Sequence, residues 1–199
     1  MIDREKKIIF LHIPKCGGTS IENFFGVDPA KFCKETLTGF YEKYGWLQHC
    51  TLTEMEIDFN IDINKFYSFT FVRNPWDRVV SSYFYDLKWI KDKKLNLLDY
   101  VKNRPEINKY HKKAHQREQY QYIIDQSNEP SINYIGKFEN LQQDFDVICD
   151  KIGIPHSKLP HKNKSNHKHY TEFYDDETRE IVAQKYAKDI EYFGYKFGD

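Results

Sequence analysis

The sequence of 199 residues has few cysteines, no long apolar run and no excess of either charge. No stretch approaches the ~18–20 apolar residues of a membrane span. The run Ile8–Ile13 is also too short for a signal peptide. The cysteines Cys16, Cys33, Cys50 and Cys149 form no CxxC pair, so neither a zinc ribbon nor a disulfide framework is predicted. We therefore expect a cytoplasmic protein without stable membrane insertion.

Net charge is absent because 30 Lys and Arg residues balance 30 Asp and Glu residues. A protein that binds nucleic acid or a membrane surface needs a net basic field, so neither partner is expected. Aromatic residues make up 17% of the chain, which excludes a disordered tail. Arginine is scarce, with 6 residues against 24 lysines, so a cluster of arginines is informative.

Apolar runs alternate with helical patterns along the chain. The runs Ile8–Ile13 and Phe66–Val72 are typical of strands buried in a parallel sheet, and a third strand is expected at Ile132–Phe138. Helical patterns follow these strands, and we also expect helices near residues 35–44 and 53–56. This order predicts a single α/β domain over residues 1–199, a three-layer domain with a central parallel sheet flanked by helices.

The motif PKCGGTS follows the first strand and leads into a helix. Backbone N–H groups in such a loop, together with the positive start of the helix, bind anions. Gly17 and Gly18 let the backbone approach a phosphate, and Lys15 adds a mobile charge. Thr19 and Ser20 add hydroxyl donors. The motif therefore predicts a P-loop-like phosphate site.

The motif differs from the Walker A pattern GxxxxGK[ST], because its lysine precedes the glycines. No acidic strand end offers a magnesium ligand, so ATPase and GTPase activities are not favoured. Thr19 and Glu22 have the spacing of a capping box, with Thr19 as the N-cap. Glu22 is also a conceivable general base, and Cys16 is expected to be a small filler.

Two of the arginines lie in the motif RNPWDR, which follows the second strand. Arg73 stands at the end of the strand, at the edge where open α/β sheets bind ligands. Its guanidinium can bind two phosphate oxygens, and Ser81 in the next helix can add another hydrogen bond. Asn74 and Pro75 suit the start of that helix. We expect Arg78 to be an ordinary surface residue.

The segments IIFLHIPKCGGTS and FTFVRNPWDRVVSSY together resemble the two nucleotide-binding segments of the sulfotransferases. They are most similar to the carbohydrate-type branch, which includes heparan and chondroitin sulfotransferases and small bacterial relatives. The resemblance implies that 3′-phosphoadenosine 5′-phosphosulfate (PAPS) is the co-substrate. The residues that would hold its 5′-phosphosulfate are Lys15, Gly17, Gly18, Thr19 and Ser20. Arg73 and Ser81 would hold its 3′-phosphate.

A weaker likeness links WLQHCT to the segment that carries the catalytic histidine in related members. It implies His49 as the general base and Lys15 as the residue that stabilises the leaving phosphate, with no metal required. The alternative for His49 is a loop histidine that bonds a backbone carbonyl. By analogy to the family, Lys162–Ser165 would reach the adenosine.

The sequence thus predicts in-line transfer of a sulfonyl group from PAPS to a hydroxyl of a sugar or glycoconjugate. A P-loop kinase for a small molecule is one alternative, and it would require ATP and magnesium. A non-catalytic nucleotide-binding module is another, and it would bind the bisphosphate product without turnover. No motif indicates an oligomeric state.

Overall fold

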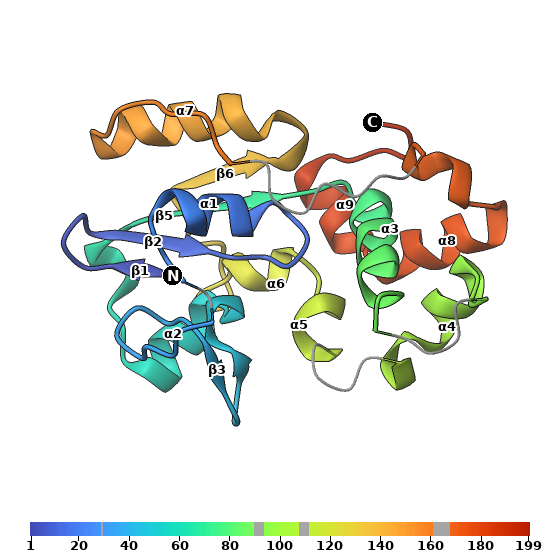
Figure 1. The fold of residues 1–199 in the computed structure, drawn as a ribbon, viewed down its shortest axis with the longest axis horizontal. Helices are drawn as coiled ribbons and strands as arrows, with labels where there is room; N and C mark the ends of the chain where they lie inside the picture. Colours follow the sequence, from blue (N-terminus) through green and yellow to red (C-terminus); the bar gives the residue numbers. More distant parts are fainter. Residues whose placement is uncertain (29, 90–93, 108–111, 161–167) are drawn as a thin grey trace. The chain divides into compact units, whose positions relative to one another are not determined.

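The computed structural model describes residues 1–28, 30–89, 94–107, 112–160 and 168–199 (Figure 1). The chain forms two compact units. The sheet unit comprises Met1–Val72 and Gln119–Lys162, and the helical unit comprises Arg73–Glu118 and Asn163–Asp199. The single domain over residues 1–199 stays a prediction.

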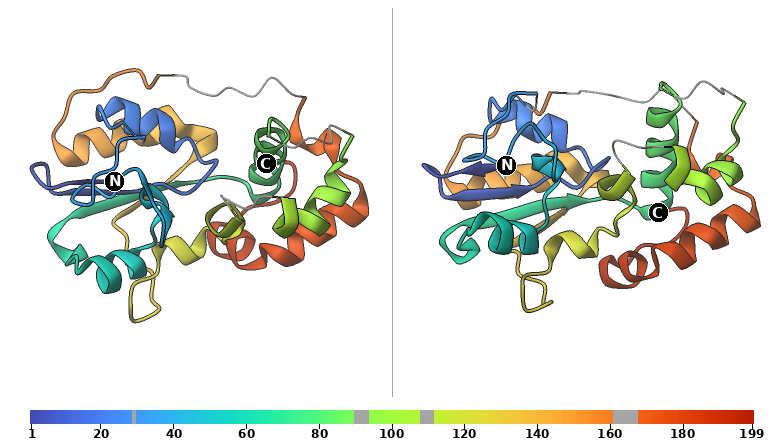
Figure 2. Two further views of the ribbon diagram at one scale, coloured as in Figure 1. Left: turned by 60° about the horizontal axis from the view of Figure 1, so that its bottom comes forward. Right: turned by 90° about the horizontal axis from the view of Figure 1, so that it is seen from below.

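The sheet unit has a central sheet with helices on both faces (Figure 2). The strands, in their order across the sheet, are β1 (Ile2–Asp3), β2 (Ile8–Leu11), β5 (Tyr67–Val72) and β6 (Tyr134–Lys137). The helices on one face are α1 (Gly18–Phe24) and α7 (Leu141–Ile152), and those on the other are α2 (Leu52–Phe59) and α6 (Tyr120–Ile123). The predicted α/β class with a helix-flanked sheet is confirmed.

The three predicted strands form the parallel part of this sheet. β2 pairs with β5 and β5 pairs with β6 in parallel, whereas the short β1 pairs antiparallel with β2. Every residue of β2 is buried, as its continuous apolar sequence requires. Phe10 stacks on Phe69, and the Thr70 hydroxyl donates to the Leu11 carbonyl at 2.7 Å. The strand that precedes the glycine loop is therefore paired on both sides and fully buried.

The expected helix near residues 35–44 is wrong. The segment holds an antiparallel hairpin of β3 (Phe40–Tyr41) and β4 (Gly45–Trp46). Gly39 and Gly45 both have a φ of 81°, a left-handed conformation that interrupts a helix. The hairpin leads into the short 3₁₀ helix η1 (Leu47–His49). The helix expected at residues 53–56 exists as α2.

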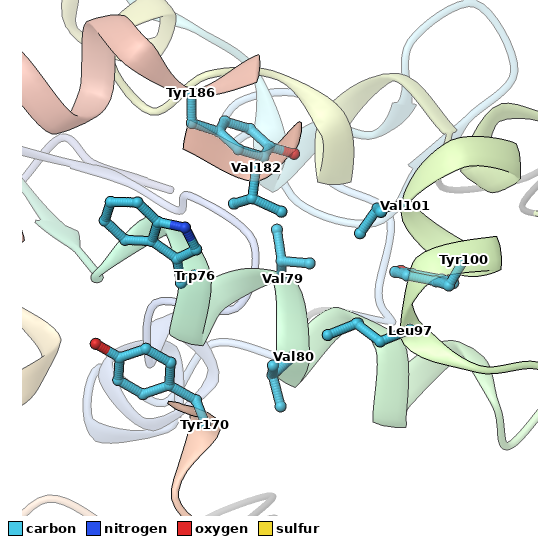
Figure 3. Close-up of a cluster of buried hydrophobic side chains, with 9 residues drawn as sticks. All are labelled: Trp76, Val79, Val80, Leu97, Tyr100, Val101, Tyr170, Val182 and Tyr186. Atoms are coloured by element: carbon cyan, nitrogen blue, oxygen red, sulfur yellow. The ribbon is translucent and has the colours of Figure 1, made fainter. Parts of the chain in front are cut away.

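The helical unit packs around an apolar cluster of its own (Figure 3). Its helices are α3 (Pro75–Asp86), α4 (Leu97–Ile107), α5 (Lys112–Gln116), η4 (Tyr170–Phe173), α8 (Asp176–Lys185) and α9 (Ala187–Phe193). Val80 and Tyr100 are fully buried in the cluster, and Tyr100 donates to Asp86 at 2.6 Å. In the sheet unit, η2 (Ile63–Lys65) and η3 (Phe138–Asn140) complete the regular elements of the described residues. No helix in these described ranges is long and apolar enough to cross a membrane.

Candidate active site

The loop between β2 and α1 contains two residues in the left-handed region. Lys15 has a φ of 70° and Gly17 a φ of 83°. Glycine adopts this conformation readily, but a residue with a Cβ pays about 1–3 kcal/mol for a sparsely populated conformation. Such strained positions cluster at functional sites. The backbone at Lys15 is therefore held by its surroundings.

The start of α1 offers backbone donors to a ligand. The N–H groups of Gly17, Gly18 and Thr19 donate to no acceptor within the described residues, whereas Ser20 donates to the Gly17 carbonyl at 3.0 Å. Unsatisfied N–H groups before and inside the first turn of a helix receive anions. The half-buried Lys15 stands in the same loop. This arrangement can bind a phosphate or a sulfate ester.

The predicted capping box of Thr19 and Glu22 is wrong. Gly17 is the N-cap of α1, and no side chain caps the helix. Thr19 already lies inside the helix. An N-cap residue has a non-helical backbone and precedes the first helical residue, so Thr19 cannot be the N-cap. Glu22 is fully buried and accepts a hydrogen bond from Nδ1 of His12 at 2.8 Å.

Glu22 is held as a buried anion. Burial raises the pKa of its carboxyl group. The charge and the hydrogen bond of His12 lower the pKa and outweigh burial, so the pKa lies below its ordinary value. A fully buried carboxylate on the inner face of α1 is poorly suited to take a proton from an acceptor hydroxyl. Its place in the apolar stripe of the helix, between Ile21 and Phe25, was the sequence signal for a buried partner.

His49 lies beside His12 at the end of β2. Its Nδ1 is 2.8 Å from the His12 carbonyl oxygen, and the two imidazole rings pack edge to face with centroids 4.6 Å apart. A carbonyl oxygen only accepts, so Nδ1 of His49 carries the proton and Nε2 is the basic nitrogen. The alternative interpretation of His49, a hydrogen bond to a backbone carbonyl, is therefore present in the structure. The same hydrogen bond leaves Nε2 as the nitrogen that can accept a proton.

Ser20, the last residue of the PKCGGTS motif, lines a cavity of about 470 Å³. Its other lining residues come from α7 and from the segment that follows it, and they are Leu141, Gln142, Asp146, His156, Ser157, Lys158, Leu159 and Pro160. The volume is typical of small-molecule sites. No sequence motif predicted that α7 and the following segment would line a cavity. The predicted adenosine contact, Lys162–Ser165, lies outside the described residues.

Arg73 and Ser81 belong to the helical unit, at the start of α3 and two turns into it. Arg73 is 7% exposed, and its Nε donates to Asp77 at 2.8 Å. The Asn74 side chain caps the helix by accepting from the Trp76 N–H at 3.1 Å, as predicted. Ser81 is buried on this helix. The ion pair with Asp77 orients the guanidinium of Arg73.

The expectation that Arg78 is a surface residue is wrong. Its side chain is 2% exposed, and Nη1 donates to the backbone carbonyl of Arg117 at 3.0 Å. The guanidinium also lies 5.9 Å from the centre of the Tyr186 ring. Arg78 therefore holds helices of the helical unit together, a role that its surface-like sequence context concealed.

The sheet, the strained loop after β2 and the backbone donors at α1 define an α/β protein with a candidate anion site at the end of β2. The chain belongs to the sulfotransferase family, whose sequence model matches residues 1–196. It is therefore an enzyme of sulfonyl transfer. The chain is also 32% identical to an uncharacterized protein of Archaeoglobus fulgidus over 89 residues, which are 44% of this chain and 68% of that relative.

Proposed function

We propose that this sulfotransferase moves the sulfonyl group of PAPS to a hydroxyl of a sugar or glycoconjugate. The observation that carries the proposal is the adjacency of two features in the sheet unit. Backbone donors at Gly17–Thr19 lie close to Lys15 in the loop, and Ser20, the next residue, lines the cavity of about 470 Å³. A ligand with an anionic end and a nucleoside would use both features.

Each residue of the two motifs has a role in this proposal. Lys15 and the loop from Gly17 to Ser20 bind the 5′-phosphosulfate. Arg73 and Ser81 bind the 3′-phosphate, and the pairing of Arg73 with Asp77 supports this role because it fixes the guanidinium plane. The cavity beside Ser20 receives the adenosine.

The chemistry needs one proton transfer and one displacement at sulfur. Nε2 of His49 takes the proton of the acceptor hydroxyl, and the acceptor oxygen forms a bond to sulfur as the bond from sulfur to the phosphate oxygen breaks. The electron pair of that bond leaves with adenosine 3′,5′-bisphosphate. Lys15 stabilises the charge that develops on the leaving oxygen. Positioning and electrostatics supply the rate enhancement, as in phosphoryl transfer, and no metal is required.

The β3–β4 hairpin supports a sugar as the acceptor. Phe40 and Tyr41 are 43–48% exposed there, and Phe40 packs edge to face on Trp46 at 5.8 Å. Exposed aromatic rings of this kind stack on the apolar faces of sugars. The hairpin continues directly into η1, whose last residue is His49. An acceptor bound to these rings would therefore lie near the proposed base.

The cysteines support a reducing compartment. All four are free thiols in the structure, and such thiols persist in the cytosol. We therefore retain the cytoplasmic location as part of the proposal.

Binding of adenosine 3′,5′-bisphosphate, measured by calorimetry in the presence of a chelator, tests the donor site. We expect the wild type to bind the bisphosphate at least tenfold more tightly than ATP. Lys15→Ala and Arg73→Ala should each weaken binding by about tenfold or more, since each removes a charge-assisted contact. The exposed residues Lys65 and Arg4 provide matched controls as alanine variants. Tighter binding of ATP, or unchanged binding by Arg73→Ala, would refute the proposal.

Turnover separates an enzyme from a binding module. With PAPS and a panel of glycans, we expect His49→Ala to lower kcat by about 10²–10⁴-fold while bisphosphate binding is retained. Unchanged turnover would remove His49 as the base. Tight bisphosphate binding by the wild type without turnover on any glycan or small hydroxyl compound would favour the non-catalytic module.

A further inference from the structure

His12 touches both the start of α1 and the proposed base. Its ring bonds Glu22 through Nδ1 and stacks on Phe10 at 5.8 Å. The edge of the ring lies against Gly18, where an added Cβ would be 2.1 Å from Cδ2 and 2.3 Å from Nε2. The ring of His49 meets the same imidazole edge to face at 4.6 Å.

The backbone of His12 contributes as well. Its carbonyl oxygen accepts the Nδ1–H of His49 and so selects the tautomer of that histidine. One residue thus contacts α1 with its side chain and holds the candidate base with its main chain. We propose that His12 is a positioning residue that aligns His49 with the phosphate loop, and that Glu22 holds His12 in place. This inference rests on the proposed function.

Glu22 fixes the orientation of the His12 ring. A turn of 180° about χ2 would bring a carbon of the ring toward the carboxylate in place of Nδ1. Burying a carboxylate in an apolar helix face is unfavourable unless it is paired. The second carboxylate oxygen of Glu22 has no hydrogen-bond partner in the described ranges. The hydrogen bond to His12, together with the charge of the buried Met1 ammonium group, compensates this carboxylate, and the hydrogen bond sets the ring position.

His12 itself is badly placed to receive the acceptor proton. Its Nδ1 is bonded to Glu22, and its Nε2 faces the Cα of Gly18 at a distance that leaves no room for a methyl group. His12 is also buried, whereas His49 is half-buried, so an acceptor hydroxyl reaches His49 more readily. Any effect of His12 on the reaction must act through His49 and the loop.

A double-mutant cycle on turnover tests the proposal. His12→Asn keeps an N–H donor near the position of Nδ1 and removes the ring. At saturating PAPS we expect it to lower kcat by about tenfold in the wild type and by less than twofold in a His49→Ala background, because its effect passes through His49. Equal factors in the two backgrounds would indicate a merely structural role and would overturn the proposal.

A spectroscopic measurement gives a second readout that needs no acceptor. Nitrogen-15 NMR of the histidine rings should show His49 in the Nδ1–H tautomer in the wild type. His12→Asn keeps the main-chain carbonyl but removes the imidazole that packs edge to face on His49. We therefore expect the His49 ring to be held less firmly against that carbonyl, and its ring signals to shift or broaden. The matched control is His169→Asn, at an exposed histidine of the helical unit, which should leave the His49 signals unchanged. Unaltered His49 signals in His12→Asn would count against the proposal.

Binding of adenosine 3′,5′-bisphosphate separates the two levels of failure. If His12→Asn binds the bisphosphate and the factors in the cycle are equal, the positioning role is wrong and the donor site stands. If the wild type fails to bind the bisphosphate, the proposed function is wrong.

Discussion

The missing side chain of Gly18 makes room for the His12 ring at the start of α1. A methyl group there would overlap the imidazole, which the hydrogen bond to Glu22 and the stacking on Phe10 hold in place. We predict that Gly18→Ala lowers the free energy of unfolding by at least about 2 kcal/mol, as overpacking does in a filled core. Urea unfolding followed by circular dichroism measures this loss.

Gly26 provides the control for this prediction. It has a φ of 68°, and no atom lies within 4 Å of the position that a Cβ would occupy, so Gly26→Asn should change stability little. Equal losses for the two variants would contradict the steric explanation at Gly18.

The lowered pKa of Glu22 sets a pH dependence of stability. Because its pKa in the folded protein lies below the ordinary value of 4.5, the carboxylate stabilises the fold above that pH, and the stabilisation is lost as the pH falls through the folded pKa. Glu22→Gln should therefore be less stable than the wild type at pH 7, and the difference should shrink on acidification below pH 4.5. Urea unfolding at several pH values measures it, and a difference that grows toward acid would contradict the pairing.

At the scale of elements, the β3–β4 hairpin is the part of the sheet unit that exposes aromatic rings beside η1. We predict that Phe40→Ala raises the KM for a glycan acceptor by about three- to tenfold, since a stacking ring contributes roughly 0.5–1.5 kcal/mol. The affinity for adenosine 3′,5′-bisphosphate should not change. Steady-state kinetics with the accepted glycan measures the effect.

Tyr192 offers a matched aromatic control, because it is 44% exposed on α9 of the helical unit. Tyr192→Ala should leave the acceptor KM unchanged. An equal rise of the acceptor KM in both variants, or no rise in Phe40→Ala, would contradict a role of the hairpin in acceptor binding.

The elements that sequence patterns predicted well are those with local signals. The predicted strands correspond to β2, β5 and β6, and Asn74 and Pro75 begin α3 as predicted. The hairpin was missed because its strands have two residues each, too short for a periodic pattern. Gly39 and Gly45, whose left-handed backbone the hairpin requires, are visible in the sequence. A glycine alone does not distinguish a turn from a helix end, so they did not predict the hairpin.

At the scale of the whole molecule, ligand binding should stabilise the folded chain. Adenosine 3′,5′-bisphosphate at about 100 times its Kd adds ~2.7 kcal/mol to the free energy of unfolding. For a chain of this size we expect the Tm to rise by roughly 5–10 °C. Differential scanning calorimetry measures the shift, which should be far smaller with ATP or in Lys15→Ala. A large shift with ATP would contradict the proposed donor.

The balanced charge of the molecule is compatible with an anionic co-substrate. The 30 basic and 30 acidic residues leave no net field to attract a large polyanion. A small anion requires only local donors, and the loop at Lys15 and the start of α3 at Arg73 offer them on separate elements. The zero net charge thus bears on polymeric partners and not on PAPS.

The sequence by itself determined the strands, the glycine loop after the first of them and the family, because these signals are written in short contiguous segments. Only the tertiary structure decided that His12 pairs with Glu22, that His49 bonds the His12 carbonyl 37 positions away, and that the chain after α7 forms a cavity with Ser20. Local propensity and spacing report on neighbours within a few turns. Contacts across longer separations depend on how β2, α1 and η1 pack against one another, and that packing is a property of the folded chain.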